Sequence, residues 1–127
     1  MPLVVVHSLP PANPEALPRM LADIRDSGAR ALRCPIDNVW VIFHAVPPGC
    51  YLQGESPANT PQARTHPPAV IVKLQAGRTR EEIDAFVTAV ASAVAQGFAV
   101  PVDNIWIHYD EMCPQDVWFR NRWSATA

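Results

Sequence analysis

The second residue of the chain is the first candidate for chemistry. Pro2 follows Met1 directly and opens a nearly continuous run of apolar residues that extends to position 9. Because proline is small, we expect Met1 to be removed, and the nitrogen of Pro2 then becomes a secondary amine at the chain end. Burial among apolar strands and nearby positive charge both lower the pKa of such an amine. It would then be partly neutral near pH 7 and able to act as a general base. The alternative is a proline that merely begins an edge strand.

Two arginines, Arg78 and Arg80, stand where a predicted strand meets a predicted helix. The planar guanidinium group is suited to recognition of a carboxylate through paired hydrogen bonds. The alternative is a solvated helix start, and Arg80 fits that alternative better than Arg78 does. Tyr51, Trp40 and Trp106 are the aromatic candidates, and for each of them packing in a core or an interface is the simpler interpretation.

The histidines and cysteines show no spacing typical of metal ligands, so we expect neither a metal nor another cofactor. An odd number of widely separated cysteines indicates reduced thiols, as in a cytoplasmic protein. The residues concerned are His7, His44, His66, His108, Cys34, Cys50 and Cys113.

An internal repeat positions these candidates. Residues 35–42 read Pro-Ile-Asp-Asn-Val-Trp-Val-Ile, and residues 101–108 read Pro-Val-Asp-Asn-Ile-Trp-Ile-His. The same offset aligns Pro2 with Pro68, so each copy begins with proline and a β-branched strand. A repeat of this kind indicates two copies of one structural unit, here β-α-β. Because the nitrogen of Pro68 is acylated, only Pro2 can become a base.

In the first unit, residues 3–9 are predicted to form a strand that is buried on both faces. A helix should follow, either capped by Asn13 with Pro14 at its first position, or starting later with Pro18 in its first turn. Residues 39–44 form the second predicted strand, and residues 51–55 a short hairpin. Residues 56–67 are polar and proline-rich, and we interpret them as the linker between the units. The apolar stripe of the helix comprises Leu17, Met20, Leu21, Ile24, Gly28 and Leu32.

In the second unit, residues 69–74 and 105–110 are the predicted strands. The sequence Thr79-Arg-Glu-Glu82 is a capping box that begins the second helix, and Gly97 is expected to end it. Its buried stripe comprises Ile83, Phe86, Val87, Val90 and Val94. The tail, residues 116–123, alternates large aromatic and basic residues and is expected to pack against other parts of the protein.

These elements predict an α+β fold in a single domain over residues 1–127. The units are residues 1–55 and 68–127, and they would join into a four-stranded mixed sheet with both helices on one face. The other face would stay apolar and uncovered, which favours an oligomer. The chain has 127 residues, 49% of them hydrophobic, and a net charge of −2. This composition indicates a globular protein and gives no reason to expect a nucleic acid or a membrane as partner.

Several segments together resemble the tautomerase superfamily, whose short members include 4-oxalocrotonate tautomerase. They are Pro2 with its hydrophobic strand, residues 75–82 with a Gly-Arg pair, residues 101–107 followed by Glu111 and Met112, and residues 48–55. The length resembles the fused two-unit members, which form trimers. The resemblance therefore implies a homotrimer with amino-terminal proline chemistry.

The resemblance also assigns roles to individual residues. It implies that Pro2 is the catalytic base, that Arg78 binds a substrate carboxylate and that Tyr51 lines the pocket. Arg80 is a further substrate-binding candidate. Trp40 and Trp106 stand where 4-oxalocrotonate tautomerase has a catalytic arginine, so Trp106 is placed in the site. The second cation would then come from Arg120 or Arg122, or be absent.

The leading hypothesis is a cofactor-independent tautomerase that acts on a small 2-oxo or enol acid. A second hypothesis is hydration, dehalogenation or decarboxylation of a three-carbon acid. Against it, His108 replaces the tyrosine of the dehalogenase branch, and Asn38 replaces the aspartate of the decarboxylase branch. A third hypothesis is a trimeric scaffold without catalytic activity.

Overall fold

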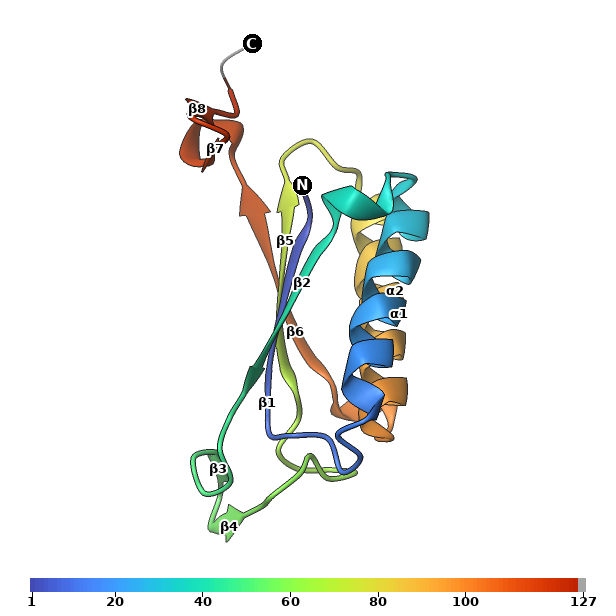
Figure 1. Cartoon of the computed structure of the whole chain (residues 1–127), viewed down its shortest axis with the longest axis vertical. Helices are drawn as coiled ribbons and strands as arrows, with labels where there is room; N and C mark the ends of the chain where they lie inside the picture. The colour runs from blue at the N-terminus through green and yellow to red at the C-terminus, as the bar shows by residue number, and fades with distance from the viewer. Residues whose placement is uncertain (126–127) are drawn as a thin grey trace.

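The computed structural model describes residues 1–125 and shows one mixed sheet covered on one face by two helices (Figure 1). The helices are α1 (Ala16–Leu32) and α2 (Arg80–Phe98). The sheet has the order β2-β1-β5-β6, with β1 (Leu3–Ser8), β2 (Trp40–Ala45), β5 (Ala69–Gln75) and β6 (Trp106–Met112). The pairs β1–β2 and β5–β6 are parallel, whereas β1 and β5 are antiparallel. The predicted fold class, with four strands in a mixed sheet and both helices on one face, is confirmed.

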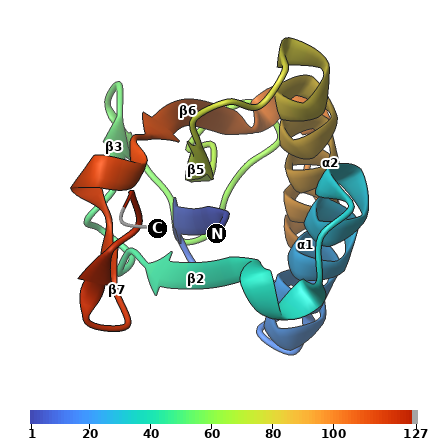
Figure 2. The same ribbon diagram turned by 90° about the horizontal axis from the view of Figure 1, so that it is seen from above.

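Shorter elements connect and extend this frame. Two small hairpins lie on the side of the sheet that faces away from the helices (Figure 2). One is formed by β3 (Leu52–Gln53) and β4 (Ser56–Pro57), so the hairpin predicted for residues 51–55 is present and reaches slightly further. The other is formed by β7 (Trp118–Phe119) and β8 (Arg122–Trp123). Short 3₁₀-helices span Ile36–Asn38, Val102–Asn104 and Pro114–Asp116.

Strand β1 is buried on one face only, which corrects the prediction of burial on both. Val4 and Val6 are fully buried beneath the helices, whereas Leu3 and Val5 on the opposite face are half-buried. The reason is that a single chain supplies helices to only one side of the sheet. The apolar run of β1 therefore includes residues that nothing in the single chain covers.

Helix α1 begins late, as in the second of the two predicted alternatives. Pro18 lies in its first turn, and the residue before the helix, Glu15, makes no side-chain cap. Asn13 instead accepts a hydrogen bond from the backbone N–H of Glu15 at 3.1 Å, which turns the chain into the helix. Helix α2 begins with the predicted capping box of Thr79 and Glu82.

The prediction that Gly97 ends α2 is wrong. The helix continues to Phe98 and is ended by Ala99, which has a φ of 56°. Gly97 is required by packing, because a Cβ atom there would clash with the side chain of Met20 on α1. Gly28 on α1 is close to Phe86 in the same way, with a Cβ-to-ring distance of 2.8 Å. The two helices thus approach closely by inserting one large side chain each at a glycine of the other.

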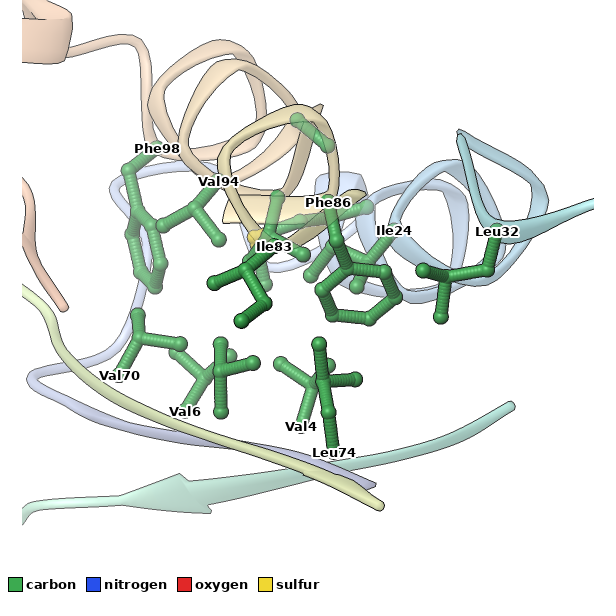
Figure 3. Close-up of a cluster of buried hydrophobic side chains, with 14 residues drawn as sticks. Val4, Val6, Ile24, Leu32, Val70, Leu74, Ile83, Phe86, Val94 and Phe98 are labelled. Carbon is green, nitrogen blue, oxygen red and sulfur yellow. The ribbon is translucent and has the colours of Figure 1, made fainter. Parts of the chain in front are cut away.

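The core lies between the helices and the sheet (Figure 3). It is formed mainly by the apolar faces predicted for the two helices and for the first strand of each unit. Its fully buried members include Val4, Val6, Met20, Ile24, Val70, Val72, Leu74, Phe86, Val90 and Val94. Within the described residues, neither helix is long and apolar enough to cross a membrane.

The antiparallel junction of β1 and β5 sends equivalent positions of the two units to opposite ends of the sheet. Near the chain start, the N–H of Trp40 donates to the carbonyl oxygen of Pro2 at 3.0 Å. At the other end, the N–H of Trp106 donates to the carbonyl oxygen of Pro68 at 3.1 Å. Because the two units join through antiparallel strands, Pro2 and Pro68 lie at opposite ends of the sheet. Trp40 is therefore the neighbour of Pro2, and Trp106 is the neighbour of Pro68.

The segment between the units is held in place by the second unit and by the first hairpin. The side-chain amide of Asn104 donates to the carbonyl oxygens of Gln62, at 2.7 Å, and Thr65, at 3.0 Å. His66 is 1% exposed, and the ring of Tyr51 meets its ring edge-on at 5.2 Å. The proline-rich linker of the sequence is therefore a packed connection.

Candidate active site at the start of the chain

The start of the chain lies at the end of the sheet where β5 and β6 finish (Figure 2). Pro2 is buried, and Met1 is half-buried. Desolvation, and after it the positive charge of Arg78, hold the pKa of the terminal amine on Met1 below its ordinary value. Cys34 acts in the opposite direction, as the smallest of the three causes. An amine at this end of the chain is therefore less basic than one in water, which is the condition for a neutral base near pH 7.

The turn after β5 brings Arg78 to this place. Gly77 has a φ of 100°, which only glycine adopts without strain, and Ala76 donates its N–H to the carbonyl oxygen of Met112 at 2.9 Å. The chain then passes through Arg78 into the capping box of α2. The side chain of Arg78 is 30% exposed and thus reaches the surface of the site.

A carboxylate fixes the direction of that guanidinium. Nη1 of Arg78 donates to Oε2 of Glu82 at 2.9 Å. The other oxygen of Glu82 accepts from the N–H of Thr79 at 3.2 Å as part of the capping box. The hydrogen bond from Arg78, and then the one from Thr79, lower the pKa of Glu82. Glu82 therefore stays ionised and links the start of α2 to the position of Arg78.

An apolar cavity of about 190 Å³ adjoins the chain start. It lies between the ends of the central strands and the hairpin β7–β8. Phe119 meets the ring of Trp40 edge-on at 5.1 Å, which attaches the hairpin to β2. The lining residues are Met1, Leu3, Trp40, Gln75, Met112, Val117, Trp118, Phe119 and Ser124.

The hairpin β7–β8 presents its aromatic residues through a two-residue turn. Arg120 and Asn121 both have positive φ, 55° and 63°, as in the type I′ turns that suit the twist of paired strands. Trp118 pairs with Trp123 across the hairpin, with ring centroids 5.3 Å apart. The predicted packing of the aromatic tail is thus realised by Phe119 on Trp40, whereas Trp118 and Trp123 remain about half exposed.

Comparison with known proteins places this geometry in a known architecture. No family model and no curated protein match the sequence. Pt0534 inactivated by 2-oxo-3-pentynoate matches with a TM-score of 0.83 and 19% identity, over 97% of this chain and 95% of that one. The Q0 fused 4-OT in a symmetric trimer matches with a TM-score of 0.81 and 24% identity, over 98% and 97%.

This chain has the fused 4-OT fold. The two-unit architecture inferred from the repeat is confirmed by these matches, which cover both units. N1, of the cis-3-chloroacrylic acid dehalogenase family, matches with a TM-score of 0.73 and 17% identity, over 96% of this chain and 82% of that one. At these identities the similarity is one of fold. The chemistry of the chain must be argued from its own residues.

Within one chain of the fused 4-OT fold, two predicted site residues lie far from Pro2. Trp106 lies beside Pro68 at the opposite end of the sheet, where its ring stacks on His108 at 6.1 Å. Tyr51 follows β2 at that same opposite end and donates its hydroxyl to the carbonyl oxygen of Pro67 at 2.7 Å. Trp106 lies there because the units join through antiparallel β1 and β5, which the sequence alone did not reveal, and Tyr51 lies there because β2 runs parallel to β1 and away from Pro2. The single chain therefore brings Trp40, and not Trp106, to Pro2.

Two further candidate arginines point elsewhere. Arg80 is 78% exposed and pairs with Asp84 at 3.1 Å on the outer surface of α2. The guanidinium carbon of Arg120 lies 5.2 Å from the centre of the Phe119 ring, in the turn of the hairpin. Neither is among the residues that line the cavity. Of the predicted cations, Arg78 is the one whose charge acts on the terminal amine.

The residues that sequence reasoning missed are Trp118 and Phe119. The sequence did mark their segment, because an aromatic tail must cover something. Nothing in the sequence indicated that these two side chains would line the cavity beside the chain start. Among residues 1–125, no group of three or more histidine, cysteine or acidic side chains is arranged to hold a metal ion, and all three cysteines are free.

Proposed function

We propose that this protein is a cofactor-independent tautomerase that interconverts the enol and keto forms of a small 2-oxo acid. The observation that carries the proposal is a partly desolvated terminal amine next to an apolar cavity. The positive charge of Arg78 also lowers the pKa of this amine. After removal of Met1, the amine belongs to Pro2, which is more deeply buried than Met1. We expect desolvation and the charge of Arg78 to lower the pKa of this amine in the same way.

The proposed reaction moves one proton. The neutral nitrogen of Pro2 accepts the proton from the 2-hydroxyl group of the enol, and the resulting ammonium returns a proton to carbon. Arg78 binds the carboxylate and stabilises the negative charge that develops on the enolate oxygen. The apolar wall limits water near the amine, which keeps the lowered pKa and prevents protonation from bulk solvent.

The pH dependence of kcat/KM tests this function. Because only the neutral amine accepts a proton, kcat/KM should rise with pH and level off once the amine has lost its proton. Since desolvation and Arg78 lower the pKa, we expect the midpoint below the ordinary value of about 8 for a terminal amine. Ketonisation of phenylenolpyruvate, followed by absorbance, gives the profile. A midpoint above 8, or a rate no greater than that of buffer, contradicts the proposal, and the latter favours the trimeric scaffold without catalytic activity.

Glu82 is proposed as a positioning residue for Arg78. Glu82→Gln keeps an oxygen for the capping box but removes the charge that fixes Nη1 of Arg78. Losing the order of one long side chain should raise KM by about twofold to tenfold and leave kcat nearly unchanged. The matched control is Asp84→Asn, which removes the exposed ion pair with Arg80 two residues further along α2, on a different face of the helix. A lower KM in Glu82→Gln would show that Glu82 competes with the substrate for the guanidinium.

We also propose that three chains assemble through the uncovered face of the sheet. Large apolar side chains are exposed on that face, among them Trp40 at 39%, Ile42 at 43% and Trp106 at 51%. The similar Q0 fused 4-OT is a symmetric trimer, and a closed ring of three would bury such a face in every copy. Light scattering should therefore give about three times 14.0 kDa. A monodisperse monomer would contradict the assembly.

A further inference from the structure

The repeated phrase forms the same local structure in both units. Each copy opens with a proline, with a φ of −62° in the first and −61° in the second, and continues as a short 3₁₀-helix. The 3₁₀-helices end at Asn38 and Asn104. In both units, the tryptophan that follows donates its N–H to the carbonyl oxygen of the proline that begins the unit. Asn38 therefore has the same relation to Pro2 as Asn104 has to Pro68.

Asn104 holds the segment that leads into its unit. Its side-chain amide donates to two carbonyl oxygens, those of Gln62 at 2.7 Å and Thr65 at 3.0 Å. These residues lie six and three positions before Pro68. One amide nitrogen thus binds two acceptor oxygens of the segment directly ahead of the proline.

Asn38 has no such segment to bind in the chain that the proposed function requires. That chain begins at Pro2, so it has no counterpart of the residues that lie six and three positions before Pro68. Asn38 is exposed, whereas Asn104 is half-buried. The amide of Asn38 therefore has two donor hydrogens for another molecule in the space ahead of Pro2.

The space ahead of Pro2 also adjoins Arg78. Met1 occupies this space, and after desolvation the charge of Arg78 is the main cause that lowers the pKa of its amine, while Cys34 raises it. Cys34 directly precedes the copy of the phrase that contains Asn38. The chain start, the segment between α1 and β2, and the turn between β5 and α2 lie at the same end of the molecule (Figure 1). Removal of Met1 thus opens a space bordered by Arg78 and by the segment of Asn38.

We propose that Asn38 is a further substrate-binding residue, whose amide donates to the 2-oxygen of the acid while Arg78 holds the carboxylate. The inference rests on the proposed function, because it places the acid in the space that Met1 leaves. A 2-oxo acid carries oxygens on two neighbouring carbon atoms, so one amide nitrogen can reach both, as that of Asn104 reaches two carbonyl oxygens. The hydrogen bond strengthens as negative charge develops on the 2-oxygen of the enolate. Such a neutral donor makes a second cation unnecessary.

The two equivalent asparagines give a matched test in protein that begins at Pro2. Asn38→Ala should lower kcat/KM for phenylenolpyruvate about tenfold to a hundredfold, with no change in Tm. Asn104→Ala removes two hydrogen bonds within the fold and should lower Tm, with less than a threefold change in kcat/KM. Equal losses of activity in the two variants, or unchanged activity in Asn38→Ala, would overturn the inference.

Asn38→Asp tests the direction of the hydrogen bond. Aspartate has the same shape, but its ionised carboxylate only accepts hydrogen bonds, so kcat/KM should fall further than in Asn38→Ala. The negative charge should also move the midpoint of the pH profile upward, because it favours the protonated amine of Pro2. Asn104→Asp, at the far end of the sheet, should leave the midpoint in place. An unchanged midpoint in Asn38→Asp would put this residue away from the amine and contradict the inference.

Light scattering tests the alternative that Asn38 holds a neighbouring chain in the way that Asn104 holds the linker. We expect Asn38→Ala to have the same mass in solution as the wild type. Dissociation of the assembly in this variant would show that Asn38 serves an interface, and the inference would be wrong.

A binding measurement distinguishes failure of the inference from failure of the function. NMR titration with two unreactive acids, 2-hydroxybutanoate and butanoate, should show tighter binding of 2-hydroxybutanoate, whose 2-oxygen accepts a hydrogen bond. Asn38→Ala should abolish this difference. If the wild type and Asn38→Ala ketonise phenylenolpyruvate equally, the inference is wrong and the tautomerase function stands. If neither ketonises it but the binding difference depends on Asn38, the function is wrong and the donor site stands.

Discussion

Protein that keeps Met1 is expected to lose at least a hundredfold in kcat/KM relative to protein that begins at Pro2. With Met1 present, the nitrogen of Pro2 belongs to an amide, whose lone pair is delocalised into the carbonyl group and cannot accept a proton at neutral pH. General-base catalysis by a positioned group contributes typically about 10²–10⁴-fold. The loss should be of that order or larger, because a retained Met1 also forms part of the cavity wall.

Two forms of one chain make this comparison. Protease cleavage of a tagged precursor can leave the chain beginning at Pro2, or leave one glycine ahead of Pro2. Intact mass identifies each form, and ketonisation of phenylenolpyruvate measures its activity. Pro2→Ala, after processing, should fall between the two, because a primary amine still acts as a weaker base. Equal activity of the two forms would show that Pro2 is not the base.

Covalent labelling gives a second measurement of the same prediction. Pt0534, which shares the fold, is inactivated by 2-oxo-3-pentynoate. A neutral amine can add to the triple bond of this reagent, so that one nitrogen–carbon bond forms and the reagent is retained whole. The form that begins at Pro2 should gain the mass of one reagent molecule on its first peptide. In the form with an added glycine, the nitrogen of Pro2 is an amide and cannot add to the reagent, so Pro2 itself should carry no label.

Arg78→Ala should lower kcat/KM by roughly 10–1,000-fold, the range expected for losing a charged hydrogen bond together with some stabilisation of the enolate. It should also move the midpoint of the pH profile upward. The positive charge of Arg78 contributes to the lowered pKa of the amine, and its removal lets the amine hold its proton to higher pH.

Arg78→Lys separates these two effects. Lysine keeps the positive charge but lacks the planar fork that binds a carboxylate through two parallel hydrogen bonds. We therefore expect KM to rise nearly as much as in Arg78→Ala, while the pH midpoint stays close to that of the wild type. The same substitutions at Arg120 and Arg122 show whether the hairpin supplies a second cation. Unchanged kcat/KM in Arg78→Ala would remove this residue from the site.

The periodicities of the sequence determined most of the fold. The repeated Pro-x-Asp-Asn-x-Trp phrase predicted two equal β-α-β units, and both are present with their strands in parallel pairs. The capping box at Thr79 predicted the start of α2. These features are local, because strand and helix periods and caps depend on residues a few positions apart. That is why the sequence alone identified them.

The end of α2 shows where local signals fail. A glycine near a helix end is usually read as its stop, yet Gly97 serves the packing of Met20, and Ala99 adopts the left-handed conformation in its place. Whether such a glycine ends the helix or makes room for a neighbouring side chain depends on the distance between the two helices. That distance is a property of the assembled core, which no local pattern contains.

The candidate site divides in the same way. Pro2 and Arg78 were identified in the sequence, the first by its place at the chain start and the second by the turn that precedes a capped helix. The relation of the two units was decided by the tertiary structure. Because β1 and β2 are parallel, Trp40 lies beside Pro2 and Tyr51 lies at the far end of the sheet. Because β1 and β5 are antiparallel, Trp106 lies at that far end as well. The aromatic wall of Trp118 and Phe119 also depends on long-range contact, since a tail hairpin must fold back onto β2. Contacts between distant segments follow from the way whole strands pair, and a single sequence carries no record of that pairing.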